Sequence, residues 1–267
     1  MNTELLAQLQ TTHPLVVNYA NFVTPNFVAN GLNALGASPI MTLAEEEADQ
    51  LMTAANALVI NIGTINHTDM PLVLALADAA KAHAKPIVLD PVAVGATSYR
   101  AEAAKKLLED YPISVIRGNA GEIAFLAGIE ANAKGIDAGD AAAAPAELAQ
   151  HCAQKYGCTV VVSGKIDAIA SGNNLATVYN ETPLLPAVVG SGDLLSSIIG
   201  AYAGLTDDYF AAALMGAATL GVAGEQTAAK LEATQGGTFA AQLLDTLATL
   251  DVEKLNTLTR YEAARRA

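Results

Sequence analysis

The stretch at residues 188–200 reads VVGSGDLLSSIIG, in which a short apolar run gives way to Gly-Ser-Gly-Asp and then to a strongly apolar helix. Gly190 and Gly192 allow the backbone to approach another group closely or to adopt positive φ. The first amide groups of a helix that opens near Asp193 have no partner inside the helix and carry the positive end of its dipole, which favours phosphate oxygens. A carboxylate beside a phosphate is repelled unless a cation intervenes or the carboxylate accepts a proton, and the second case describes a kinase that acts on an alcohol. A simpler interpretation is a tight turn whose Asp caps a buried helix.

Upstream of this stretch, apolar strands alternate with helices at intervals of about 25 to 30 residues, which predicts an α/β fold in which a mainly parallel sheet carries helices on both faces. The expected strands are 14–17, 38–41, 57–62, 86–89, 113–116 and 158–162. Two shorter extended pieces, 167–170 and 175–179, predict a hairpin at the edge of the sheet, with its turn at 172–174. Residues 130–146 are expected to form a surface segment, and the sequence after residue 190 is expected to be largely helical to its end. No repeat or linker divides the chain, so we expect one domain over 1–267.

Composition limits the partners and the compartment. The chain has 267 residues, 52% of them hydrophobic, and its 14 basic against 27 acidic residues give a net charge of −13. This charge disfavours a nucleic-acid partner. Only Cys152 and Cys158 are present, which fits a reducing compartment. Residues 1–10 lack the basic start of a signal peptide, and the uncharged run 209–224 is too short for a membrane span, so we expect a cytoplasmic protein without a membrane partner. The run 209–224 instead predicts a helix that is buried on several sides.

Unusual polar or small residues recur where the predicted strands end. They are Asn18 and Asn21, Met41, Gly63 and Thr64, Asp90, Arg117 to Asn119, and Ser163 with Gly164. Ligands of parallel sheets bind beyond the carboxyl ends of the strands. We therefore expect these residues to surround a binding site.

These residues could serve phosphoryl transfer, which needs positioning and positive charge around the moving phosphate. The amides of 190–193 would stabilise the phosphate oxygens, and Arg117 would clamp a phosphate with two hydrogen bonds. Asp90 and Glu122 are candidates to hold Mg²⁺, directly or through its waters. Asp193 would accept the proton of the substrate hydroxyl, provided that the hydroxyl lies within hydrogen-bond reach.

Each of these residues also has a structural explanation. Asn119-x-x-Glu122 has the pattern of a capping box. Asp90 with the following proline is a common end to a strand, Arg117 fits a structural ion pair, and Met41 fits core packing. The histidines lack metal-ligand spacing. The sequence contains no G-x-x-x-x-G-K-[ST], G-x-S-x-G or G-x-G-x-x-G motif, which weakens the interpretations as a P-loop ATPase, an esterase or a dinucleotide oxidoreductase.

Taken together, these motifs resemble the hydroxyethylthiazole kinase family of the ribokinase-like superfamily. The resemblance covers most of the chain and consists of several motifs in the expected order. They are Asn30-Gly31-Leu32 with Leu35-Gly36-Ala37-Ser38-Pro39, Asn61-Ile62-Gly63-Thr64, Leu89-Asp90-Pro91-Val92 with Gly95-Ala96, Ile116-Arg117-Gly118-Asn119-Ala120 with Glu122-Ile123, and Gly190-Ser191-Gly192-Asp193.

The resemblance implies a three-layer ribokinase-like fold and a homotrimer with active sites between subunits. It also implies ATP as cosubstrate, Mg²⁺ as cofactor, and phosphorylation of the primary alcohol of 4-methyl-5-(2-hydroxyethyl)thiazole in thiamine biosynthesis or salvage. The implied substrate-binding residues are Met41, Gly190, Asn21 and Gly63. The implied ATP-binding residues are Arg117 and Ser163, to which Gly192 of the anion hole is added. Asp90 and Glu122 are implied to serve the metal and the phosphates, and position 193 is implied to be catalytic.

Three positions depart from the family pattern. The family often has Cys where this chain has Asp193, whereas other kinases of the superfamily use Asp as the base, so we expect the chain to be competent. Val17 and Ala20 replace the His and Thr of an H-N-x-T-N pattern, which leaves the exact alcohol open. The alternative enzyme is a related vitamin kinase that acts on a hydroxymethylpyrimidine or pyridoxal. The alternative of another class is a nucleotide-binding protein that has lost catalysis.

Overall fold

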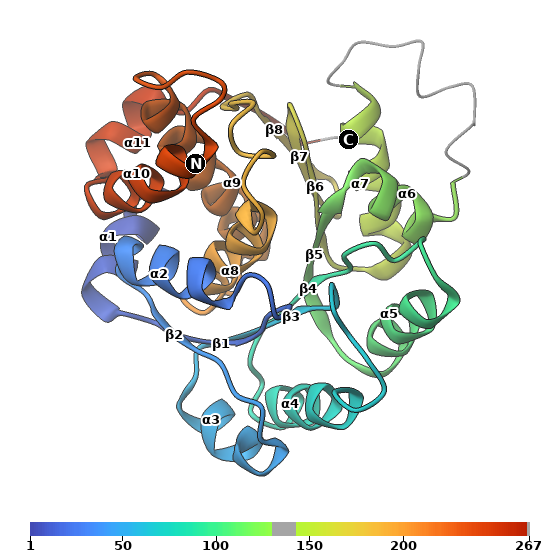
Figure 1. Cartoon of the computed structure of the whole chain (residues 1–267). Helices are drawn as coiled ribbons and strands as arrows, with labels where there is room; N and C mark the ends of the chain where they lie inside the picture. The colour runs from blue at the N-terminus through green and yellow to red at the C-terminus, as the bar shows by residue number, and fades with distance from the viewer. Residues whose placement is uncertain (130–142, 266–267) are drawn as a thin grey trace.

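The computed structural model describes residues 1–129 and 143–265, and in these residues nine strands form one sheet in the order β2-β1-β3-β4-β5-β6-β7-β8-β9 (Figure 1). The strands are β1 (Leu15–Tyr19), β2 (Ser38–Ile40), β3 (Ala57–Asn61), β4 (Ile87–Asp90), β5 (Ile113–Asn119), β6 (Thr159–Ser163), β7 (Asp167–Ser171), β8 (Asn174–Val178) and β9 (Tyr261–Arg265). Neighbouring strands from β2 to β6 are parallel, and β7, β8 and β9 each run antiparallel to the preceding strand of the sheet. The prediction of a mainly parallel sheet is confirmed.

Helices cover both faces of this sheet, as predicted (Figure 1). One face carries α1 (Glu4–Thr12), α2 (Pro25–Leu35), α8 (Ser191–Ala203), α9 (Tyr209–Ala228), α10 (Gly236–Ala248) and α11 (Val252–Leu258). The other face carries α3 (Ala48–Ala54), α4 (Met70–Ala82), α5 (Ser98–Asp110), α6 (Ala120–Ala127) and α7 (Ala143–Tyr156). A short 3-10 helix, η1 (Glu45–Glu47), precedes α3.

The central strands are covered on both sides, which explains why they read as continuous apolar runs. Every residue of β3 and β4 is buried. Alternate residues serve opposite layers, because side chains along a strand point to opposite faces. Val59 and Val88 belong to the core on the α8 face, whereas Leu58 and Leu89 belong to the core on the α4 face. Each layer therefore covers alternate residues of these central strands.

The apolar run 209–224 forms most of α9, which packs against α8, α10 and the sheet. This confirms the prediction of a helix that is buried on several sides. In the part of the chain that the structure describes, no helix is long and apolar enough to cross a membrane.

Four boundaries differ from the predictions. Asn18 and Tyr19 continue β1, and Arg117 to Asn119 continue β5, although both runs were predicted as loops. The hairpin of β7 and β8 is not at the edge, because β9 pairs with β8. The sequence after residue 190 is largely helical, as predicted, and β9 is the exception. The predicted surface segment 130–146 lies outside the described residues as far as residue 142, and α7 begins at Ala143.

The order of the strands creates one switch point. From β1 the chain crosses outward to β2 and then returns past β1 to β3, so β1 lies between them. Chain segments that leave β1 and β3 diverge at such a point, and the resulting crevice at the carboxyl ends of the strands is where open α/β sheets bind ligands. Asn21 follows β1 and Gly63 follows β3, so the fold places both beside this crevice.

Candidate active site

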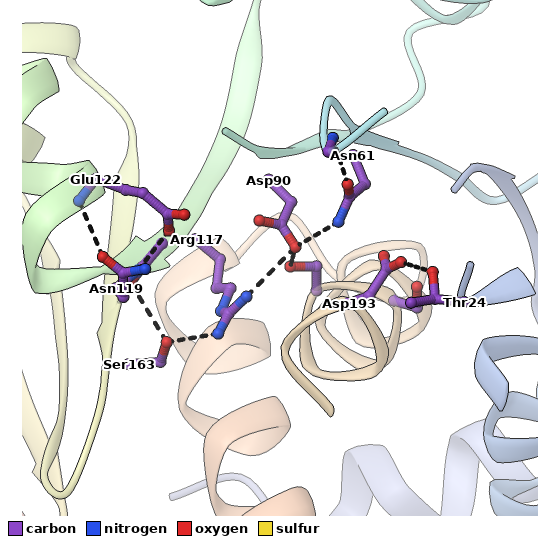
Figure 2. A network of polar contacts seen from close by, with 12 residues as sticks. Thr24, Asn61, Asp90, Arg117, Asn119, Glu122, Ser163 and Asp193 are labelled. Atoms are coloured by element: carbon purple, nitrogen blue, oxygen red, sulfur yellow. Dashed lines mark hydrogen bonds and ion pairs between the residues drawn. The ribbon is translucent and has the colours of Figure 1, made fainter. Parts of the chain in front are cut away.

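The first turn of α8 lies at the carboxyl ends of the central strands and carries Asp193 (Figure 2). Gly190 is the N-cap with φ 98°, and a Cβ there would lie 3.0 Å from Thr24 and 3.3 Å from Phe27. Positive φ and close neighbours together require glycine. Among the described residues, none accepts a hydrogen bond from the backbone N–H of Gly192 or Asp193. Two free donors at the positive end of the helix dipole favour an anion, and their role as an anion hole stays a prediction.

Asp193 does not cap α8, so the simpler interpretation of the Gly-Ser-Gly-Asp stretch was wrong. Its side chain is 5% exposed, and its Oδ2 accepts hydrogen bonds from the Thr24 hydroxyl and from Asn21 Nδ2, the latter at 3.2 Å. Burial, and then the negative charge of Asp90, raise the pKa of Asp193 to about 7, against the hydrogen bond from Thr24 and the charge of Arg117. A carboxylate with this pKa is a far stronger base than an ordinary aspartate.

Asp90 ends β4 and is wholly buried. Its Oδ2 accepts hydrogen bonds from Ser196 Oγ at 2.8 Å and from Asn61 Nδ2 at 3.0 Å (Figure 2). The same oxygen lies 3.3 Å from Arg117 Nη1, while Oδ1 is buried and has no hydrogen-bond partner in the part of the chain that the structure describes. Burial raises the pKa of Asp90, although Arg117 and Ser196 oppose the shift. One oxygen of this carboxylate is therefore held by the protein and the other is left unsatisfied.

Arg117 joins three elements of the site. From β5 it pairs with Asp90 and donates from Nη2 to Ser163 Oγ on β6 at 2.6 Å. Its guanidinium also lies against the start of α8, because a Cβ on Gly192 would be 2.5 Å from Nη1. The ion pair that we considered as an alternative is present, and it sets a positive charge beside the free amides of the helix. A side chain at position 192 would displace this guanidinium from the start of α8.

Glu122 closes a capping box with Asn119, as the structural interpretation predicted (Figure 2). Its Oε2 accepts from Asn119 N at 2.8 Å and its Oε1 accepts from Ala93 N at 2.8 Å. Both oxygens thus fasten backbone, one at the start of α6 and one in the loop after β4. Its charge also contributes to the raised pKa of Asp90, so the two carboxylates act on each other.

The carboxylates fit Mg²⁺ in one specific way. The buried Oδ1 of Asp90 is an unsatisfied hard oxygen donor, which is the kind of ligand that Mg²⁺ prefers. Over residues 1–129 and 143–265, no group of three or more His, Cys, Asp or Glu residues could hold a metal ion by itself. Mg²⁺ usually binds through one or two carboxylates, waters and substrate phosphates. Asp90 offers such a free oxygen, whereas both oxygens of Glu122 already accept backbone hydrogen bonds, and the metal role of both residues stays a prediction.

A cavity of about 690 Å³ adjoins these residues. Its lining brings together all three predicted ATP-binding residues, Arg117, Ser163 and Gly192. The opposite wall consists of residues 180–182 with Leu220 and Gly221. The volume falls within the ordinary range for ligand sites. A second cavity, of about 570 Å³, lies at the amino ends of β4, β5 and β6, away from every carboxylate described above.

The four predicted substrate-binding residues do not all lie together, unlike the predicted ATP-binding residues. Asn21 contacts Asp193 directly, and Gly63 donates from its N–H to Asn61 Oδ1 at 2.8 Å. Gly190 caps α8, at the same turn. Met41 follows the carboxyl end of β2, half-buried against the core on the α8 face, and it is not part of the hydrogen-bond network. The structure thus groups three of the four around Asp193.

Sequence reasoning missed three residues of the network. Thr24 orients Asp193, and Asn61 and Ser196 hold Asp90. Asn61 had a signal, because it ends a strand and lies in a motif that we compared with the family. Ser196 follows Asp193 by three residues and so lies on the same side of α8. Thr24 had no local signal, because its partner is 169 residues away along the chain.

Comparison with known proteins gives consistent matches. The model of the "Hydroxyethylthiazole kinase family" matches residues 6–253. The hydroxyethylthiazole kinase of Pediococcus pentosaceus is 48% identical over 265 residues, which cover 99% of this chain and 100% of that protein. The structure of a hydroxyethylthiazole kinase from Pyrococcus horikoshii has a TM-score of 0.88 and 33% identity, covering 98% of both chains. A ribokinase-like superfamily protein of Enterococcus faecalis, at 14% identity and a TM-score of 0.61 over 92% of this chain and 94% of that one, shares the fold.

Proposed function

This chain belongs to the hydroxyethylthiazole kinase family, and from that premise we propose that it transfers the γ-phosphoryl group of ATP to the primary hydroxyl of 4-methyl-5-(2-hydroxyethyl)thiazole. We place this reaction in the cytoplasm, in thiamine biosynthesis or salvage. The observation that carries the proposal is Asp193. Its pKa is raised to about 7, and it lies at the anion hole, beside a cavity that Arg117 lines.

Asp193 acts as the general base in this proposal. Thr24 and Asn21 fix Oδ2, which leaves Oδ1 to receive the hydroxyl proton of the alcohol. The proton moves to the carboxylate as the alcohol oxygen attacks the γ-phosphorus, and the bond from that phosphorus to the bridging oxygen of ADP breaks. A base whose pKa is near neutrality suits this task better than an ordinary aspartate.

The charge on the transferring oxygens is met by the free amides of Gly192 and Asp193 and by Arg117. Because Arg117 lies against Gly192, both sources of positive charge reach the same place. Asp90 and Glu122 would hold Mg²⁺, with Oδ1 of Asp90 as the oxygen that the protein leaves free. When bound, the ion neutralises negative charge on the phosphates.

The direct test is ADP release from Mg·ATP with and without the hydroxyethylthiazole. Thiazole-dependent ADP supports the proposal. If hydroxymethylpyrimidine or pyridoxal is turned over instead, the substrate is that alcohol and the chain is a related vitamin kinase. ATP binding without ADP from any of the three alcohols contradicts the proposal and favours a nucleotide-binding protein that has lost catalysis.

The raised pKa of Asp193 predicts a pH dependence. The base works only when ionised, so at saturating ATP and alcohol kcat is expected to fall as the pH is lowered through about 7, rather than through the ordinary range near 3.8. The fall should approach about tenfold per unit at lower pH, since one proton is involved. Asp167 lines the same cavity, and burial raises its pKa to about 6, so its protonation should act on the KM for ATP. A kcat that stays flat down to pH about 5 would contradict the assignment of Asp193.

We extend the proposal to a homotrimer with active sites between subunits. Four large apolar side chains are exposed at the edge of the sheet that carries the site. Their exposed fractions are 78% for Phe22, 60% for Val23, 91% for Leu43 and 74% for Val189. Phe22 and Val23 follow β1, Leu43 follows β2, and Val189 precedes the anion hole. Apolar side chains gathered in this way are typical of an interface, and a second copy seated there would complete the site.

Leu43→Asp is therefore expected to shift the protein from trimer to monomer and to reduce turnover with it, because an interfacial carboxylate would have to lose its water. Light scattering after size exclusion measures the mass. Lys105→Asp, at an exposed position on α5, serves as the control and should remain trimeric. A wild-type protein that is monomeric at the concentrations of the assay, with full activity, would rule out the shared site.

A further inference from the structure

The wall of the cavity opposite Arg117 is the start of a loop that ends at the anion hole. Residues 180–182 line the cavity, and the same chain continues from β8 to Gly190 at the start of α8. Asn180 is 4% exposed and Thr182 is 5% exposed, whereas Glu181 between them is exposed. The far end of the loop is fixed by Ser191 Oγ, which donates to Leu185 O at 2.7 Å. The position of the wall therefore depends on what holds its first residues.

One face of helix α9 supports residues 180–182. Gly221, Gly224 and Glu225 are spaced three and four residues apart, which places them side by side. A Cβ on Gly221 would lie 2.7 Å from Asn180 O, so the loop packs directly on the helix backbone. Glu225 then accepts from Asn180 Nδ2 at 2.7 Å and from Glu181 N at 3.0 Å. One carboxylate thus holds a side chain and a backbone amide of the wall.

Arg260, just before β9, supplies the other support. Its guanidinium donates to both oxygens of Glu225, from Nη1 at 3.0 Å and from Nη2 at 2.6 Å, which is the strong two-pronged arrangement. Its backbone N–H donates to Asn180 Oδ1 at 2.7 Å. Although partial burial opposes the shift, the hydrogen bonds from Arg260 and Asn180 lower the pKa of Glu225. The carboxylate is therefore held in its charged form.

The ion pair is not needed to hold the last strand. β9 pairs with β8 over five residues, from Tyr261 opposite Val178 to Arg265 opposite Asn174. The backbone hydrogen bond from Tyr179 N to Arg260 O at 2.8 Å continues this pairing without the Arg260 side chain. The Nη2 group of Arg260 also donates to Tyr179 O at 2.9 Å, on the chain that leads into the wall. Within the described residues, the Arg260 guanidinium thus donates to Glu225, which supports the wall, and to Tyr179 O, which precedes it.

We propose that Glu225 and Arg260 are positioning residues for the nucleotide, which hold residues 180–182 against the part of ATP that lies beyond its phosphates. This inference rests on the proposed use of ATP. The phosphate end of the cavity is at Arg117 and Gly192, and the wall at 180–182 is on the other side, where β8 ends three strands away from β5. Loss of the Glu225–Arg260 pair should therefore weaken the binding of the nucleotide without changing the affinity for a bare phosphate chain.

The test compares Arg260→Met, Glu225→Gln, Arg260→Lys and the double variant Glu225→Gln/Arg260→Met in the full chain. Titration calorimetry gives the Kd of ADP and of inorganic tripolyphosphate, and steady-state kinetics give KM for ATP and for the thiazole. Arg260→Met and Glu225→Gln should each raise the Kd of ADP by about five- to thirtyfold. The Kd of tripolyphosphate and the KM of the thiazole should change by less than about twofold. The double variant should be no worse than either single variant, since both act on one wall.

Arg260→Lys keeps the positive charge but loses the two-pronged contact with Glu225, so its Kd for ADP should lie between those of the wild type and Arg260→Met. Lys106→Ala, which breaks an exposed 2.7 Å pair with Asp110 on α5, is the matched control and should bind ADP as the wild type does. Unchanged ADP binding in all variants overturns the inference, and so does equal weakening of ADP and tripolyphosphate, which would mean general loosening. Absence of ADP binding by the wild type overturns the proposed use of ATP as well, which distinguishes the two failures.

Discussion

Asp193→Asn is expected to lower kcat for thiazole phosphorylation by about 10³-fold, within the range that general acid–base catalysis contributes. The amide cannot accept the hydroxyl proton, whereas its oxygen can still accept the hydrogen bonds of Thr24 and Asn21. The geometry of the first turn of α8 should therefore survive, and the Kd of ATP should stay within about threefold of the wild-type value, because the free amides and Arg117 are untouched. The effect should be almost entirely in kcat.

The same substitution should leave the fold intact or stabilise it. The pKa of Asp193 is raised from 3.8 to about 7 in the folded chain, so between these values the folded protein binds this proton more tightly than the unfolded chain does. The free energy of unfolding therefore falls as the pH rises through that window, and the loss is complete above it. Asn carries no charge, so at pH 8 the melting temperature of the variant should be equal to that of the wild type or higher. Each kcal/mol gained in the free energy of unfolding should raise it by about 2–4 °C. The difference should vanish near pH about 4.

Asp208→Asn is the matched control for Asp193→Asn. Asp208 also lies at the start of a helix, where it caps α9 by accepting from Ala211 N at 3.0 Å, but it does not line the nucleotide cavity. Because Asn caps a helix about as well as Asp does, this change should alter stability little and leave kcat unchanged. If Asp193→Asn kept wild-type turnover, Asp193 would not be the base. If Asp193→Asn melted far below the wild type, the buried charge of Asp193 would not be destabilising the folded protein as we infer.

The parts of this site that the sequence predicted are those that depend on local rules. Free amides at the start of α8, glycine at 190 and the capping box at 119–122 all follow from a few adjacent residues. The alternation of strands and helices placed Asp90, Arg117 and Ser163 at one edge of the sheet, and the structure brings them into hydrogen-bond contact. Their mutual distances needed the sheet order, which spacing along the chain does not contain.

Long-range pairings explain the failures. β9 carries Glu262, Ala263 and Ala264, which have weak strand propensity, and it forms a strand because β8 offers an unpaired edge. The strand was predicted to end at Ile116, where the apolar run ends, whereas pairing with β6 continues β5 through Asn119. Thr24 joins Asp193 only through the packing of α2 on α8.

The position of Val17 shows that the face of the sheet to which a side chain points decides whether it can affect the substrate pocket. As a departure from the family pattern it raised doubt about the substrate pocket. In the structure Val17 is fully buried in the core on the α3 and α4 face, away from the α8 layer that carries Asp193. We therefore assign this departure to packing. Ala20 follows β1 and is half-buried beside Asn21, so a change in the pocket would come from that position.

Arg117→Met is expected to damage both stability and catalysis, because Arg117 serves two partners. Its side chain is 12% exposed and that of Asp90 is wholly buried, so removal of the guanidinium leaves an uncompensated buried carboxylate. Breaking a buried pair in this way costs about 3–5 kcal/mol. The same change removes positive charge beside the free amides of α8, and kcat/KM for ATP should fall by about 10³-fold, as when a transition-state arginine is lost.

Two further variants separate these effects. Arg117→Lys keeps a charge near Asp90 and should recover most of the stability, but a single ammonium cannot bond Asp90 and Ser163 and also clamp a phosphate, so kcat/KM for ATP should stay at least about tenfold low. Arg117→Met with Asp90→Asn removes both charges, and its free energy of unfolding should exceed that of Arg117→Met alone. Urea unfolding and steady-state kinetics measure the two quantities. If Arg117→Lys regained full kcat/KM, the two-pronged contact would have no part in phosphate binding. If the double variant were no more stable than Arg117→Met, the charge of Asp90 would not be what Arg117 compensates.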